Sequence, residues 1–368
     1  MKSKPTSLTK LALKKFFKNK VGLFSLFYIL ICGFVAVFAY TFAPDNSPNA
    51  QIQHIEIHTK KPFFKVNLLT EKREKVLHQS FLNKLFFGNE NYALETPINN
   101  YKIENDTLIV DLYSENNTIK STNFKKQKSF YYNKNAKNHK YKVKKKIFYL
   151  GTDKYGRDYL SRMLIGTRIS FFIGFIAVFI SLIIGISIGA IAGYFGGKVD
   201  AFVMWLINVT WSIPTLLMVI AITLALGKGY WQVFIAVGLT MWVEVARVVR
   251  GQIMSAKQQQ YVEAANALGF SNFRIITKHI LPNIMAPVIV ISAANFAAAI
   301  LIESGLSFLG IGAQPPTPSW GAMIKDHYNY IILGKAYLAV IPGLAIMSLV
   351  MAFMLIGNAL RDALDVKG

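Results

Sequence analysis

Long uncharged stretches alternate with short polar segments along most of the chain, and this alternation predicts membrane-spanning helices. About 20 apolar residues suffice for a helix to cross a ~30 Å hydrocarbon core. Six runs of roughly this length are present, at residues 21–43, 170–194, 201–226, 231–249, 283–303 and 338–360. We therefore expect an all-α polytopic membrane protein with six transmembrane helices and with both termini on the same side.

Residues 44–150 interrupt this pattern, because Lys, Asn, Glu and Tyr dominate them and long apolar runs are scarce. Apolar residues alternate with polar ones from Thr107 to Tyr113, which predicts a β-strand. The lysine-rich tract 125–146 is typical of a flexible or surface-exposed segment. The sequence thus predicts a partly β or disordered insert between the first and second spans, and it does not reveal the role of this insert.

The distribution of charge orients the chain. Residues 1–20 contain seven Lys and no acidic residue, so the positive-inside rule places them in the cytoplasm. The run 21–43 is too long for the core of a signal peptide, and we expect it to remain as the first transmembrane helix. The insert then lies outside the cytoplasm, because long domains are translocated largely regardless of their charge. The net charge of +22 comes with no nucleic-acid-binding motif, which argues against that class.

Small residues recur at four-residue intervals in the second span: Ser181, Gly185, Gly189 and Gly193. On a helix this spacing forms one flat face that lets two helices approach closely in lipid. We expect this face to pack against another helix rather than to line a substrate path.

Three further segments, all polar or rich in turns, lie between the spans. Residues 151–162 read GTDKYGRDYLSR and precede the second span. Residues 251–282 separate the fourth and fifth spans and contain EAANALG at 263–269 and ILP at 280–282. Residues 307–321 read SFLGIGAQPPTPSWG, and their Pro and Gly content predicts turns rather than helix.

Together these segments resemble the permease subunits of importer-type ABC transporters, in the branch that handles dipeptides, oligopeptides and nickel. The resemblance covers residues 150–368 almost throughout and residues 1–43 loosely, but not residues 44–150. It implies the fold of a type I importer permease and a C-type subunit in the bacterial inner membrane. The implied partners are a homologous permease, two ATP-binding subunits and an extracytoplasmic substrate-binding protein.

The loop 251–282 is expected to dock the ATPase, as the "EAA" loop does in the family. Residues 258–268 are typical of a helix that Gly269 ends in the left-handed conformation, and Pro282 is expected to end a second helical piece. Small residues at helical spacing would form the docking face. The alternative is a helix that lies on lipid headgroups. The predicted docking residues are Tyr261, Glu263, Ala264, Ala265, Leu268, Gly269 and Pro282.

By the same resemblance, the other two segments lie near the outer mouth, where a binding protein docks. The residues concerned are Gly151, Asp153, Gly156, Arg157, Asp158, Pro315, Pro316, Trp320 and Gly321. Two alternatives stay open. In the first, the arginines mark only the start of an interfacial helix from which they reach into water, and in the second the Pro-rich loop is packed without contacting a partner.

Nothing in the sequence suggests catalysis on this chain. A Gly-rich phosphate loop with Lys followed by Ser or Thr is missing, and no catalytic triad, zinc-ligand set or carboxylate pair can be assembled. His54 and His58 have no further ligands nearby and are predicted to be surface residues. Glu244, within the fourth span, is expected to pair with Arg247. We therefore expect no cofactor or metal on this chain, with ATP and Mg bound by the partner ATPase.

These expectations describe a non-enzymatic permease subunit that imports di- or oligopeptides by alternating access. Nickel or another small solute stays open as the cargo, as does whether the partner permease is a second copy or a different chain. A different class also stays open, namely a membrane-anchored sensor or assembly protein that works through residues 44–150.

Overall fold

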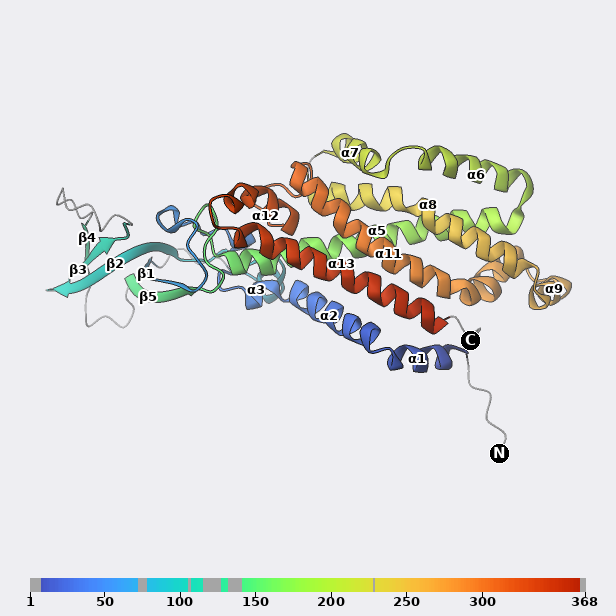
Figure 1. Ribbon diagram of the computed structural model, residues 1–368, viewed down its shortest axis with the longest axis horizontal. Coiled ribbons are helices and arrows are strands. Elements are labelled where there is room, and N and C mark those ends of the chain that lie inside the picture. The colour runs from blue at the N-terminus through green and yellow to red at the C-terminus, as the bar shows by residue number, and fades with distance from the viewer. Residues whose placement is uncertain are drawn as a thin grey trace, which may run out of the picture.

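Long helices make up most of the computed structural model, which describes residues 8–71, 78–104, 107–114, 127–131, 141–227 and 229–364 (Figure 1). Five helices in these ranges are long and apolar enough to cross a membrane. They are α2 (Lys20–Val37), α5 (Tyr159–Phe195), α8 (Tyr230–Lys257), α11 (Leu281–Leu309) and α13 (Tyr337–Leu364). Together they form one elongated bundle, in agreement with the predicted class of fold.

The expected third span, residues 201–226, is broken into two helices. α6 (Gly197–Trp211) and α7 (Thr215–Leu226) meet at an angle of 88°. Pro214 lies at the junction, where it has no N–H to continue the hydrogen bonding of a helix. The expected third span is therefore fully broken, and among the described residues a sixth crossing exists only if the bent pair counts as one span.

α5 and α8 pack directly against each other through the small residues of α5. A Cβ atom added at Gly185 would lie 2.6 Å from Cβ of Val245, and one at Gly193 would lie 2.7 Å from the carbonyl oxygen of Arg250. At Gly189 the added atom would overlap the backbone of Ala246. Any side chain at these glycines would push the two helices apart. The four-residue spacing thus corresponds to the face of α5 that meets α8.

α1 (Leu8–Lys18) lies at the same end of the bundle as the last turns of α13 (Figure 1). Its Phe16 is buried and packs against Ala359 of α13. Asn19 then caps α2 by accepting a hydrogen bond from the N–H of Gly22 at 3.0 Å. The described part of the basic N-terminal segment therefore contains a packed helix, α1, that leads directly into the first span.

The insert contains a five-stranded antiparallel sheet with the strand order β4-β3-β2-β1-β5. The strands are β1 (Phe64–Glu71), β2 (Leu94–Glu104), β3 (Thr107–Leu112), β4 (Gln127–Tyr131) and β5 (Tyr141–Phe148). The predicted strand at 107–113 is confirmed as β3. The tract 125–146 was expected to be flexible or exposed. Its residues 127–131 and 141–146 belong to strands, in which Lys128, Lys142, Lys144 and Lys145 are exposed, and the rest of the tract lies outside the described residues.

The sheet buries apolar side chains on both faces. Val66 and Leu68 of β1 pack with Phe148 of β5 on one face, and Leu69 packs with Val110 of β3 on the other. The sheet lies beyond the end of the bundle that is opposite to α1 (Figure 1). Among the described residues, insert and bundle are thus distinct parts that meet at the end of the helices opposite to α1.

Short elements connect these parts. They are α3 (Ala39–Phe42), η1 (Pro48–Ala50), η2 (Ile55–Ile57), α4 (Phe81–Phe87), α9 (Gln260–Ala267), α10 (Asn272–Arg274), the π-helix η3 (Ile275–Ile280), α12 (Trp320–His327) and η4 (Tyr328–Ile331).

Candidate functional site: an inner loop, an inner groove and an outer motif

The inner loop, residues 258–280, lies at the end of the bundle where α1 and the end of α13 also lie (Figure 1). One side of its helix α9 is buried, since Val262 is fully covered and Ala265 is only 3% exposed. These two residues pack in a cluster with Ile253 of α8, with Ile275 of η3 and with Ile284 of α11. The inner loop is therefore anchored to both helices that it connects.

The other side of the inner loop is exposed. Six of the seven predicted docking residues are exposed: Tyr261, Glu263, Ala264, Leu268, Gly269 and Pro282. Ala265 is the exception, because it is three residues from Val262 and shares the buried face of α9. Ala265 therefore does not lie on the exposed side of α9, and its docking role stays a prediction.

Phe273 is an exposed residue of the inner loop that is not among the predicted docking residues. Its side chain is 77% exposed and that of Leu268 is 72% exposed, so the loop presents two large apolar groups outward. In the sequence, the feature that points to Phe273 is an aromatic residue between Asn272 and Arg274 in a polar segment.

The turn of the inner loop is held in one conformation. Gly269 has a φ of +72°, which is the left-handed conformation expected from the sequence. The N–H of Phe270 donates to the carbonyl oxygen of Ala265 at 3.2 Å. The ring of Phe270 stacks on His279 with an interplanar angle of 14°, and the Arg274 guanidinium lies 4.2 Å from the centre of the same ring.

The inner loop continues into α11 without an interruption of the helix. Residues Asn272–Leu309 form one helical stretch, so the expectation that Pro282 ends a helical piece is wrong. Pro282 lies in the first turn of α11, where a missing N–H is tolerated. Just before it, η3 widens the helix, and the N–H of Leu281 bonds to the carbonyl oxygen of Ile276, five residues back. A displacement of the loop would thus act directly on α11.

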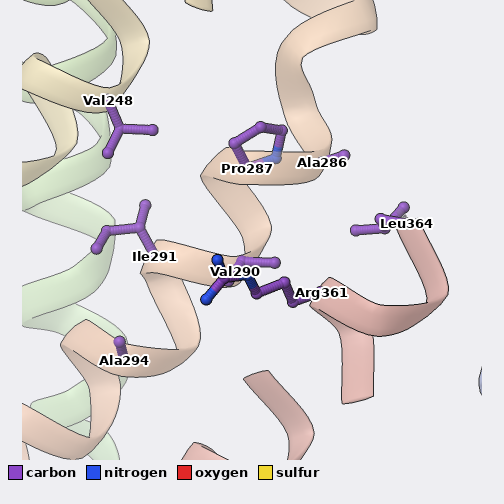
Figure 2. A pocket seen from close by; sticks show the side chains of 8 residues that line it. All are labelled: Val248, Ala286, Pro287, Val290, Ile291, Ala294, Arg361 and Leu364. Atoms are coloured by element: carbon purple, nitrogen blue, oxygen red, sulfur yellow. The ribbon is translucent and has the colours of Figure 1, made fainter. Parts of the chain in front are cut away.

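An inner groove of about 540 Å³ lies between α8, α11 and α13 (Figure 2). Its lining is apolar except for one charged residue: Val248, Ala286, Pro287, Val290, Ile291, Ala294, Arg361 and Leu364. Arg361 points from α13 toward α11. The helices on either side of the inner loop, α8 and α11, therefore also form walls of this groove.

Glu244 lies one helical turn before Val248 on α8 and is exposed. Its expected ion pair with Arg247 is not formed, because the Arg247 guanidinium instead lies 3.6 Å from the ring centre of Trp211 on α6. The ion pair of this region joins Arg250 to Asp200. Among the described residues, Glu244 has no ion-pair partner.

The outer motif, residues 151–162, is organised around the fully buried carboxylate of Asp153. One oxygen of this carboxylate accepts hydrogen bonds from the N–H groups of Tyr155, at 2.8 Å, and Arg157, at 2.9 Å. The other accepts from Nε of Arg157 at 2.5 Å and lies 3.7 Å from Nε of Arg162. Two buried guanidinium groups thus share one buried carboxylate.

The outer motif also ties three distant segments together. Arg162 donates to the carbonyl oxygens of Asn49, at 3.1 Å, and Pro316, at 3.4 Å. The indole N–H of Trp320 donates to the carbonyl oxygen of Met163 at 3.1 Å. A Cβ atom at Gly156 would overlap the carbonyl oxygen of His54. The start of the insert, the N-terminus of α5 and the loop 307–321 therefore form one packed unit.

Titratable groups in this unit have shifted pKa values. Burial raises the pKa of the Asp158 carboxyl, although its hydrogen bonds from Ser161 oppose the shift. Burial lowers the pKa of His327, whose ring lies between the carbonyl oxygen of Met323 and the N–H of Lys154. The neutral imidazole satisfies both contacts, with Nδ1 donating and Nε2 accepting.

Most of the residues predicted for the outer mouth are internal. Seven of the nine are buried: Gly151, Asp153, Gly156, Arg157, Asp158, Trp320 and Gly321. Only Pro315 and Pro316 are exposed. The two prolines are thus accessible at this end, whereas the other seven residues lie inside the packed unit.

Comparisons with known proteins agree with this arrangement. Residues 185–367 match a family model described as binding-protein-dependent transport system inner membrane component. Residues 7–61 match a model described as N-terminal TM domain of oligopeptide transport permease C. The second match reaches past residue 43, so the expectation that no resemblance extends into 44–150 is wrong for residues 44–61.

Individual relatives show the same likeness. The chain is 42% identical over 219 residues to the dipeptide transport system permease protein DppC of Bacillus subtilis, covering 60% of this chain and 68% of the relative. It is 39% identical to the glutathione transport system permease protein GsiD of Pectobacterium atrosepticum, covering 60% and 72%. A solved structure of the inward-facing MetNI methionine ABC transporter aligns with a TM-score of 0.46 and 17% identity, over 55% of this chain and 95% of the other.

Proposed function

The chain belongs to the family of inner membrane components of binding-protein-dependent transport systems, and from this premise we propose that it is one permease subunit of an ATP-driven peptide importer. Its partners are a homologous permease, two ATP-binding subunits that bind ATP and Mg, and an extracytoplasmic substrate-binding protein. The chain itself catalyses no reaction, and both of its termini lie in the cytoplasm.

The observation that carries this proposal is the two-sided inner loop. Its inner side is fixed to α8 and η3 through Val262 and Ala265, while its outer side presents Leu268 and Phe273. Fully burying an apolar side chain of this size contributes roughly 1.5–3 kcal/mol, so a partner that covers both gains appreciable binding energy. An ATP-binding subunit that docks at these residues can therefore bind the permease tightly.

The continuous helix from Asn272 to Leu309 supports the coupling step. A docked ATPase that moves on ATP binding would displace the inner loop as a unit, because the turn at Gly269 is held by the Phe270, His279 and Arg274 stack. The displacement would pass into α11 and α8, the two helices that border the inner groove. Alternating access would then consist of opening and closing this groove.

Peptides are the cargo that the comparisons favour. The relatives named above are a dipeptide permease and a glutathione permease, and neither is named for nickel. Uptake of a labelled dipeptide by cells that express the whole transporter tests this assignment. Unlabelled di- and tripeptides should compete with the label, whereas Ni²⁺ should not. Competition by Ni²⁺ alone would contradict the peptide assignment.

Docking is tested by placing a charge on the exposed side of the inner loop. In Leu268→Asp and Phe273→Asp variants, the ATP-binding subunits should no longer co-purify and uptake should be lost. The amount of permease in the membrane should stay unchanged, since both side chains are exposed in this chain. Phe63→Asp is the matched control, because Phe63 is 68% exposed but lies in the insert, just before β1. Normal uptake in both loop variants would refute the docking site.

A further inference from the structure

The short helix α4 between β1 and β2 has a composition that is unusual for a water-exposed segment. Its sequence is FLNKLFF, and none of its residues is buried. Four large apolar side chains are exposed: Phe81 at 76%, Leu82 at 60%, Phe86 at 40% and Phe87 at 68%. Soluble surfaces rarely gather so many apolar groups in one place, which indicates that another phase or molecule covers α4.

Contacts fix α4 at the outer end of the first and second spans. Nη1 of Arg168 on α5 donates to the carbonyl oxygen of Phe86 at 2.7 Å, and its guanidinium lies 5.2 Å from the ring centre of Tyr40 on α3. The N–H of Asn89 donates to the carbonyl oxygen of Asn46 at 2.8 Å. α4 is therefore attached to the bundle, although it belongs to the insert.

The same contacts define the depth of α4 in the membrane. Arg168 is the last charged residue before the uncharged stretch 169–197 of the second span. An arginine at this place marks the boundary between headgroups and hydrocarbon, which its long side chain can reach. Since Phe86 is bonded to Arg168, α4 lies at the level where aromatic residues are enriched in membrane proteins.

The apolar surface of α4 adjoins that of the first span. α4 packs on α3, which contains Phe42. The side chain of Phe42 is 49% exposed, and its ring centre lies 5.8 Å from that of Phe34 on α2. Phe34 is itself 55% exposed on a helix that must face lipid over much of its surface. A hydrocarbon-facing strip thus runs along α2 and α3 up to α4.

We propose that α4 is an interfacial anchor that inserts Phe81, Leu82, Phe86 and Phe87 into the outer leaflet of the bilayer. The anchor fixes the insert at one height above the membrane, so that the sheet cannot swing freely on its two connections to the bundle. Lys84 on the same helix suits the headgroup region, where its ammonium group meets phosphate. Neither family model covers this part of the chain, so the anchor is a feature of the insert.

Site-specific labelling of the assembled transporter tests the anchor. Cys32 is the single cysteine and is buried, so a Cys32→Ser background allows one label at a time. Phe87→Cys, or Phe81→Cys if that variant does not accumulate, receives an environment-sensitive fluorophore in phosphatidylcholine–phosphatidylglycerol vesicles. Tyr101→Cys is the matched control, because Tyr101 is 47% exposed on β2 of the distant sheet (Figure 1).

Nitroxide-labelled lipids should quench the α4 label several-fold more strongly than the Tyr101 label, and iodide in the water should show the opposite order. Two results would overturn the proposal. Equal access of iodide to both labels would mean that α4 is covered by water. Protection of the α4 label from both iodide and nitroxide lipids would mean that a protein subunit covers it.

Discussion

The outer motif and the inner loop are both short polar segments beside long helices, but their side chains point in opposite directions. In the outer motif, Asp153, Arg157 and Arg162 are all at most 5% exposed and satisfy one another. In the inner loop, Leu268 and Phe273 extend outward and contact little of their own chain. The first arrangement suits a clamp within the chain, and the second suits a surface for a partner. A charged motif is therefore no guide to a contact site until its internal partners are known.

Two glycines with the same backbone conformation give the largest expected contrast. Gly156 and Gly269 both have a φ of +72°, but only at Gly156 does an added Cβ atom meet backbone, namely the carbonyl of His54. Gly156→Ala should destabilise the protein by on the order of 4 kcal/mol or more, enough to prevent its accumulation. Gly269→Ala should cost only about 1–2 kcal/mol, the penalty of the left-handed conformation itself. Thermal unfolding in detergent and membrane abundance measure both, and equal losses would contradict the contrast.

Removal of one charge should separate the two regions in the same way. Asp153→Asn leaves the guanidinium groups of Arg157 and Arg162 buried without their carboxylate, which costs about 3–5 kcal/mol. Glu263→Gln changes an exposed carboxylate, and the free energy of unfolding should shift by no more than about 0.5 kcal/mol. Denaturation midpoints of the two variants decide the matter. A stable Asp153→Asn protein would show that the packing of the outer motif does not depend on this charge.

The outer unit should also make stability depend on pH. Because burial lowers the pKa of His327 in the folded state, the unfolded chain takes up the proton first as the pH falls. The contribution of His327 is fully present above its ordinary pKa of about 6.5 and is lost below it, by at most about 1.4 kcal/mol per pH unit. In a His327→Gln variant, the unfolding temperature should depend less steeply on pH between pH 5 and 7. An unchanged slope would mean that His327 is not sealed from water.

Removal of the sheet should have the smallest effect. Phe64 and Phe148 are direct partners on neighbouring antiparallel strands, so a short Gly-Ser linker can replace residues 65–147. Uptake should persist, because the contacts of the outer motif with the insert involve residues 45–61 and not the sheet. A longer deletion of residues 52–147 is the control, and it should prevent folding since Gly151 and Gly156 pack on this segment. Loss of uptake in the shorter deletion with normal membrane abundance would assign the sheet a role in transport.

Much of the fold follows from local sequence patterns. Uncharged runs predict the spans, the spacing of Gly185, Gly189 and Gly193 predicts the face of α5 that meets α8, and Gly269 predicts its own left-handed turn. Each of these inferences depends on residues close in sequence. The break between α6 and α7 was not predictable, because a proline reveals a missing donor but not the direction in which the chain continues.

The rest of the site depends on contacts between distant residues. Arg162 is buried only because Asn49 and Pro316 come to it from more than 100 residues away on either side. Similarly, Ala265 looks like its neighbour Ala264 in the sequence, and only the packing of α9 on η3 separates the buried position from the exposed one. The lysines of β5 hide its strand character, because the adjacent Lys144, Lys145 and Lys146 interrupt the alternation of apolar and polar positions that marks a strand.

The central claim is that the exposed side of the inner loop contacts the ATP-binding subunit. Photo-crosslinking tests this contact most directly. A photoreactive amino acid replaces either Phe273 in the inner loop or Phe63 in the insert, which are 77% and 68% exposed. Irradiation of membranes that contain the whole transporter should join position 273, and not position 63, to the ATP-binding subunit. Absence of that product from position 273, with the transporter still active, would contradict the account.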